Sequence, residues 1–428
     1  MDLPLRLLPV EERWTCHGCG ICCRHVIIPL SPEEYARIRA QGWDKDPTLA
    51  GKRLFVRTQL WPPRYRLAHQ EDGYCVFLSP TGRCRIHERF GAEAKPLVCR
   101  MFPYQTVALD KFAYLTLRHN CPSVIRHAGQ PLSQQEDQWQ PLAEHPRLRP
   151  QATVPPPITL GYRGTWNQFL RSAAVVERLL CNPSYPMVRR LVHALLFAQT
   201  LDACRLSRLD QERYIELLRM LEESVPKEAE PLFRDRVPPD AASQFIFRRV
   251  LLDYLRLHPG FPLQESWQGR IQWAKMALAI ARGKGTIPAL APPEVALKFE
   301  GEPATFSGSV SLAELDRSLT GLHRDVLKPL DEYYEAMAIS RRFAVNGRRG
   351  WPLTDRIRAL AASFPAALAV LRLATPGRLP TADDMMAVVI ALDRGEGLAS
   401  LASRTYRRRL RALGRSGQLI RLVIWWAR

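Results

Sequence analysis

The chain has 428 residues, 46% of them hydrophobic and 24% charged, which is a globular composition with room for two or three domains. It carries 61 basic and 42 acidic residues, and the formal net charge of +19 favours anionic partners without selecting nucleic acid, lipid or acidic protein. The opening residues MDLPLRLLPVEERW do not read as a secretory signal. No apolar run reaches the roughly 18 residues of a membrane span, so we expect a cytoplasmic protein with no transmembrane segment.

Cysteines are concentrated near the start of the chain. Eight of the ten lie between Cys16 and Cys121, and the other two are Cys181 and Cys204. In a reducing compartment, clustered cysteines bind metal more often than they form disulfides. The isolated pair falls in helical patterns, where a thiol usually serves as a small core residue. Short apolar runs at 25–30, 74–79 and 106–117 predict strands between metal-binding turns.

The stretch CHGCGICC carries the densest spacing. Cys16, Cys19 and Cys22 form C-x2-C-x2-C, the three-ligand run of a cubane iron–sulfur cluster. Gly18 and the glycine after Cys19 supply the flexible backbone of such a turn. The fourth ligand of a cubane can be remote and followed by proline, and Cys121 has that context.

A second site is predicted from the remaining thiols. Adjacent side chains diverge, so Cys23 should not share the geometry of Cys22 and instead joins Cys75, Cys84 and Cys99. Eight thiols suit two four-ligand sites. Zinc remains open as an alternative to iron, because zinc prefers closed sites of four cysteines, or of three cysteines and one histidine. The histidines near enough in sequence to substitute are His17, His25, His87 and His119.

Together these motifs resemble the YkgJ-like zinc- or iron-chelating cysteine-cluster proteins, defined by C-x2-C-x2-C-C. The resemblance covers about residues 14–125 and includes CHGCGICC, GYCVFLSPTGRCRIHERF and KPLVCRMFPY. A related branch is flagellin lysine N-methylase, which implies methyl transfer from S-adenosylmethionine to lysines of flagellin. This chain departs from that branch in its compact cysteine spacing. No Gly-rich nucleotide loop occurs in the chain.

The fold class predicted is α+β, mainly α. We expect a cysteine-cluster metal-binding module at residues 1–128, a Pro/Gln-rich linker at 129–164 and a helical domain at 165–428, with a division near 285–310 if it comprises two units. Apolar residues at i, i+3, i+4 and i+7 predict helices over 165–181, 187–204, 210–225 and 242–258. Prolines at 226, 238, 259, 288, 352 and 380 are expected to end such segments.

The chain ends in a basic, Trp-rich segment. The simpler interpretation is a solvated helix followed by a tail docked in the core. The alternative is contact with an anionic surface through Trp425 and Trp426. No nucleic-acid-binding module is recognisable, so nucleic acid is an unlikely partner. Two functions follow: a cysteine-cluster protein that binds zinc, iron or a 4Fe-4S cluster, or an iron–sulfur-dependent protein lysine methyltransferase with S-adenosylmethionine as cofactor and a substrate such as flagellin.

Overall fold

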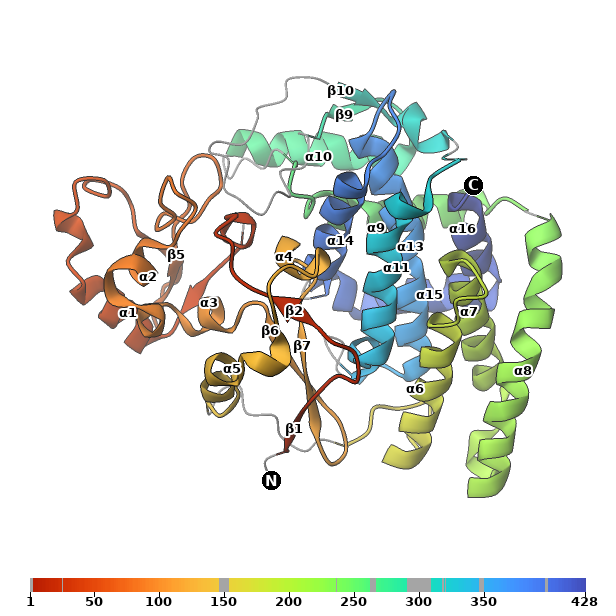
Figure 1. The fold of residues 1–428 in the computed structure, drawn as a ribbon. Helices are drawn as coiled ribbons and strands as arrows, with labels where there is room; N and C mark the ends of the chain where they lie inside the picture. The colour runs from red at the N-terminus through yellow and green to blue at the C-terminus, as the bar shows by residue number, and fades with distance from the viewer. Residues whose placement is uncertain are drawn as a thin grey trace.

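The fold joins a strand-containing N-terminal module to a large helical domain (Figure 1). The computed structural model describes residues 3–24, 26–145, 154–235, 237–261, 267–290, 309–317, 319, 321–345, 350–396 and 399–428. The prediction of an α+β, mainly α fold is confirmed. The predicted division near 285–310 falls largely outside the described residues, and the domain boundaries stay a prediction.

The N-terminal module consists of short elements. Its strands are β1 (Leu5–Leu7), β2 (Arg13–Trp14), β3 (Pro29–Leu30), β4 (Phe55–Gln59), β5 (Arg64–Leu67), β6 (Tyr104–Ala108), β7 (Ala113–Leu117) and β8 (Gln130–Pro131). Its helices are α1 (Pro32–Ala40), α2 (Arg85–Phe90), α3 (Leu97–Met101), α4 (Pro122–Ile125) and α5 (Glu136–Ala143). Sheets have the orders β1-β7-β6, β3-β5-β4 and β2-β8. The β2–β8 pair and α5 include residues from the predicted linker.

Two small hydrophobic cores support this module. One gathers side chains of residues 28–94 around Trp43 and Phe77. The other lies under the β6–β7 hairpin, around Tyr104 and Leu117. Strands are predicted at 106–117 and 25–30. The first run lies in the β6–β7 hairpin, and the second contains β3. The run 74–79 forms only isolated bridges, at Tyr74, Cys75 and Leu78, because the chain makes a turn closed by the amide of Leu78 on the carbonyl of Cys75.

The helical domain encloses one continuous core. Its helices are α6 (Trp166–Leu180), α7 (Met187–Ala203), α8 (Gln211–Asp235), α9 (Ala241–Leu255), α10 (Trp267–Arg282), α11 (Arg324–Ile339), α12 (Arg342–Val345), α13 (Leu353–Ala374), α14 (Ala382–Gly395), α15 (Arg404–Arg415) and α16 (Gln418–Trp426). A hairpin of β9 (Thr286–Pro288) and β10 (Ser309–Ser311) completes it. The predicted helices α6, α7 and α9 are confirmed.

One predicted helix end is wrong. Pro226 does not stop α8, which continues to Asp235 through a second proline, Pro231. An interior proline costs a helix about 3 kcal/mol because it removes a hydrogen bond and crowds the preceding turn. Buried side chains on both sides, including Val225 and Ala229, pack this helix on its neighbours α6 and α7, and that packing outweighs the local preference.

Helix α13 occupies the centre of the domain. It packs against α7, α9, α14, α15 and α16, and all 22 of its residues are buried. By length and composition alone, this helix could cross a membrane. Its uninterrupted apolar run is shorter than the helix, so the sequence pattern does not indicate it. Its arginines are held inside: Arg358 contacts Asp202 at 2.5 Å, and Arg372 donates to the carbonyl of Trp426 at 2.7 Å. Burial on every side accounts for its apolar composition.

Candidate metal centre

The CHGCGICC segment folds as a loop that ends in a tight 3₁₀ turn, Ile21–Cys23. Gly18 and Gly20 have φ values of 71° and 73°, in the left-handed region that glycine adopts without strain. The turn places the Sγ atoms of Cys22 and Cys23 3.8 Å apart. The expectation that these two side chains diverge is therefore wrong, because a 3₁₀ turn rather than an extended strand carries them.

The first predicted thiol set is Cys16, Cys19, Cys22 and Cys121. Burial raises the pKa of the Cys19 thiol to about 12, and thiolate charge on the other three members raises it further. Burial likewise raises the pKa of Cys121 to about 12, with Cys22 as the next cause. These mutual effects place the remote Cys121 in electrostatic range of the loop thiols, at the start of α4. All ten cysteines of the chain are free thiols.

The second predicted thiol set is Cys23, Cys75, Cys84 and Cys99. The amide of Cys75 donates to the carbonyl of Cys23 at 2.8 Å, which ties two of its segments together. Cys84 follows the turn after Cys75 and pairs with Leu78 in a β-bridge. Burial raises the pKa of Cys75 to about 12, with Cys84 contributing. Burial and then Cys75 also raise the pKa of Cys99. Cys22 is among the charges that raise the pKa of both Cys75 and Cys99, so electrostatic effects link the two predicted sets.

The thiols approach one another without forming a complete coordination sphere. Within the described ranges, no three His, Cys, Asp or Glu side chains are gathered closely enough to hold one metal ion. The donor chemistry nevertheless fits zinc or iron, which thiolates bind in sets of four. A backbone hydrogen bond links Cys75 to Cys23, and electrostatic effects link Cys99 and Cys121 to Cys22. Ligation would require these side chains to turn toward a shared ion.

Five of the eight thiols pack in three different hydrophobic cores. Cys75, Cys84 and Cys99 pack against the core around Trp43, and Cys121 belongs to the core under the β6–β7 hairpin. Cys19 packs against the core of the helical domain. Ile21, which is 1% exposed, lies within that same core. A ligand joining these thiols would therefore join the module to the helical domain.

Two of the candidate histidines, His17 and His119, contact groups other than the thiols. Nδ1 of His17 lies 2.9 Å from Oγ of Ser123, in the helix that follows Cys121. His87 is exposed on α2. His119 is buried, and burial followed by the charge of Arg342 lowers its pKa to about 4. His25 lies outside the described residues.

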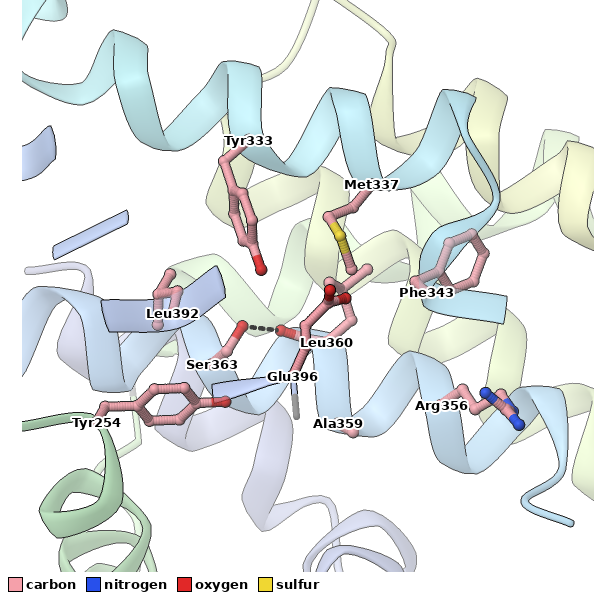
Figure 2. A pocket seen from close by; sticks show the side chains of 10 residues that line it. All are labelled: Tyr254, Tyr333, Met337, Phe343, Arg356, Ala359, Leu360, Ser363, Leu392 and Glu396. Atoms are coloured by element: carbon pink, nitrogen blue, oxygen red, sulfur yellow. Dashed lines mark hydrogen bonds between the residues drawn. The ribbon is translucent and has the colours of Figure 1, made fainter. Parts of the chain in front are cut away.

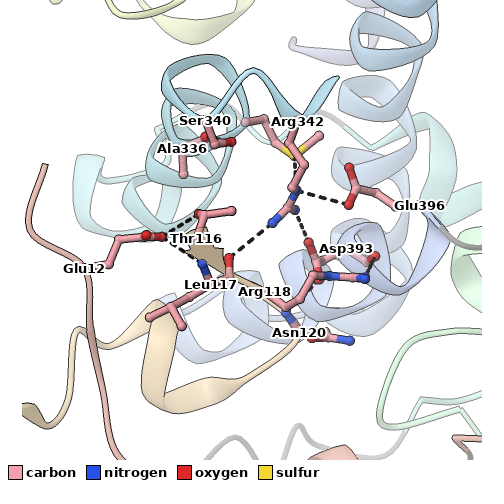
Figure 3. Close-up of polar contacts among 11 residues, drawn as sticks. Glu12, Thr116, Leu117, Arg118, Asn120, Ala336, Ser340, Arg342, Asp393 and Glu396 are labelled. Atoms are coloured by element: carbon pink, nitrogen blue, oxygen red, sulfur yellow. Dashed lines mark hydrogen bonds and ion pairs between the residues drawn. The ribbon is translucent and has the colours of Figure 1, made fainter. Parts of the chain in front are cut away.

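The end of helix α14 is bonded to the segment 118–120, which precedes Cys121 (Figure 3). Asp393 is fully buried and accepts from Nε of Arg118 at 2.7 Å and from the amide of Asn120 at 3.1 Å, one residue before Cys121. It also forms an ion pair with Arg342 of α12. Arg342 in turn donates to the carbonyl of Leu117 at 3.2 Å. The last residues of β7 are thus fixed to two helices.

The next residue, Arg394, is bonded to the CHGCGICC loop. Its Nη2 donates to the carbonyl of Ile21 at 2.8 Å, between the loop cysteines, and its Nη1 donates to the carbonyl of Leu257 at 3.3 Å. The charge of Arg394 is also one of the effects that lower the pKa of Cys22, after the contact with Cys23. Two consecutive residues, Asp393 and Arg394, therefore bond to the backbone beside Cys121, at Asn120, and to the CHGCGICC loop, at Ile21. The sequence gives no motif for either residue.

A small cavity lies elsewhere, between α9, α11, α13 and α14 (Figure 2). It is lined by Tyr254, Tyr333, Met337, Phe343, Arg356, Ala359, Leu360, Ser363, Leu392 and Glu396. None of these residues is a cysteine. Cys181 and Cys204 end helices α6 and α7 and pack against the helical core, as predicted.

Comparison with known proteins identifies the thiol region. Residues 15–122 match the family model CxxCxxCC, described as "Putative zinc- or iron-chelating domain". The matched span contains both thiol sets. No curated protein and no solved structure is significantly similar to the chain. The match therefore supports a chelating domain in the N-terminal quarter and leaves the helical domain without a family.

Proposed function

We propose that the protein binds zinc or iron through the two thiol sets, and that the bound metal fastens the N-terminal module to the helical domain. The observation that carries this proposal is a group of eight free thiols, five of which pack in three different hydrophobic cores, one of them the core of the helical domain. The match to a chelating domain supports the same chemistry. Free thiols also favour a reducing compartment, and we propose the cytoplasm.

Each residue around the thiols has a distinct part in this proposal. The cysteines would supply the thiolates, either to zinc or to a 4Fe-4S cluster. Arg394 holds the backbone of the loop at Ile21, and Asp393 holds the segment before Cys121 through Asn120. Such support of a ligand's backbone fixes where its side chain can point, which reduces the ordering that binding must impose.

Single cysteine replacements test the two-set arrangement. In protein purified without oxygen, Cys19→Ser should remove the metal held by the first set, and Cys84→Ser should remove that held by the second. Cys204→Ser, a matched replacement in the helical domain, should leave metal content unchanged. Elemental analysis with sulfide determination measures this and distinguishes zinc from iron–sulfur. Equal metal loss from Cys204→Ser and the other two variants would contradict the proposal.

Methyl transfer to a protein such as flagellin stays a prediction. No contact among the described residues favours it over chelation. Titration with S-adenosylmethionine, with the Cys22→Ser variant as control, tests it separately from metal binding.

A further inference from the structure

The turn between β4 and β5 presents two large apolar side chains to solvent. Leu60 is 76% exposed and Trp61 is 86% exposed, side by side in the sequence. The strands that carry them belong to the β3-β5-β4 sheet of the N-terminal module. Leaving adjacent Leu and Trp side chains in water is unfavourable by about 1.5–3 kcal/mol for each fully exposed side chain, so this turn gains by contact with an apolar phase.

The backbone carbonyls of this turn are already hydrogen-bonded to side chains of the protein. Arg57 donates from Nε to the carbonyl of Gln59 at 3.2 Å and from Nη2 to the carbonyl of Leu60 at 2.6 Å. Nε2 of Gln59 donates to the carbonyl of Trp61 at 2.8 Å. The two prolines that follow have no amide hydrogen. Three successive carbonyls are thus satisfied internally and two donors are lacking, which lowers the cost of desolvating the turn.

The charged residues of the chain segment that carries the turn are all basic. Between Asp46 and Glu71 the chain has no acidic residue. The basic residues of that interval are Lys52, Arg53, Arg57, Arg64 and Arg66. Arginine and lysine beside an apolar tip match anionic headgroups above an acyl layer, and tryptophan favours the boundary between the two.

We propose that the β4–β5 turn inserts into the surface of an anionic lipid bilayer, with Leu60 and Trp61 entering the interface and the neighbouring arginines contacting headgroup phosphates. A bilayer fits better than single-stranded nucleic acid. Stacking of successive bases needs several aromatic faces along a groove, whereas this turn offers one aromatic ring beside an aliphatic side chain. The inference rests on residues outside the thiol sets and is independent of the proposed metal binding.

Vesicle sedimentation tests this with the full-length protein. It should bind vesicles of phosphatidylcholine containing phosphatidylglycerol and bind pure phosphatidylcholine vesicles much less, with binding reduced by salt. The double variant Leu60→Ser/Trp61→Ser should lower the partition coefficient about tenfold or more, since two apolar side chains are lost. Trp267→Ser is the matched control, because Trp267 is 69% exposed but lies on α10.

Quenching of tryptophan fluorescence by brominated lipids gives a second measurement. It should occur in the parent protein and in Trp267→Ser, and be largely lost in Trp61→Ser. The proposal is overturned if anionic vesicles are not bound, if both tryptophan variants weaken binding equally, or if the tip variants lose binding to a single-stranded oligonucleotide while vesicle binding is unchanged.

Discussion

The N-terminal module and the helical domain are stabilised by different means. The helical domain surrounds one fully buried helix, α13, with a continuous core. The N-terminal module has strands of two to five residues and two separate small cores. Small cores of this kind commonly depend on a metal or a crosslink. All eight thiols of the two predicted sets lie in the N-terminal module, whose small cores stabilise it less. Metal binding is therefore expected to contribute most to folding there.

Removing a buried contact between the N-terminal module and the helical domain should have the largest effect on stability. Asp393→Ala would leave Arg118 without a carboxylate partner and Arg342 with Glu396 alone. We expect a loss of about 3 kcal/mol in the free energy of unfolding, at the low end for a broken buried pair because Glu396 remains. Denaturant unfolding measures this. Asp383→Ala is the control, because Asp383 pairs with Arg126 at the surface and should change stability by less than about 1 kcal/mol. Equal losses of stability in the two variants would show that the buried Asp393 pair does not fasten the N-terminal module to the helical domain.

The same carboxylate predicts a dependence on pH. Burial alone would raise the pKa of Asp393, but Arg118 and Arg342 outweigh it and lower the pKa from 3.8 to about 2. Because the folded value is the lower one, the stabilisation is complete above the unfolded pKa and is lost as pH falls toward 2. The stability difference between the parent and Asp393→Asn should therefore be constant near neutral pH and shrink below about pH 4. A difference that does not change down to pH 2 would contradict this account.

A smaller effect is expected at the neighbouring residue. Arg394→Met removes the donors to the carbonyls of Ile21 and Leu257, so the thiol loop has more conformations to lose when metal binds. We expect metal affinity to fall about 10- to 100-fold, the usual range for groups that support ligands. Competition with a chromophoric chelator measures it. Arg408→Met, on the exposed face of α15, should leave affinity unchanged. Unaltered affinity in both variants would remove Arg394 from the supporting role.

Sequence patterns predicted what is local. Helical periodicity identified α6, α7 and α9, and the C-x2-C-x2-C-C spacing indicated a chelating domain. Local rules failed at Pro226, where side-chain packing carries α8 through the proline. They also failed at Cys22 and Cys23, whose turn geometry a spacing does not specify.

Long-range contacts were beyond such patterns. Asp393 and Arg118 are separated by 275 residues and belong to no motif. Their pairing arises only when the helical domain folds against the β6–β7 hairpin. The Trp-rich tail is a similar case: Trp426 is 2% exposed and packs in the core, whereas Trp425 is half-buried. Contact of this segment with an anionic surface stays a prediction.

Metal content measured together with thiol reactivity tests the central claim most directly. Protein purified without oxygen should contain zinc, or iron with sulfide, and its eight N-terminal thiols should react with a thiol reagent only after the metal is removed. Removing the metal should also loosen the N-terminal module to protease while the helical domain stays folded. A folded protein that takes up neither metal, with all eight thiols reactive from the start, would contradict the account.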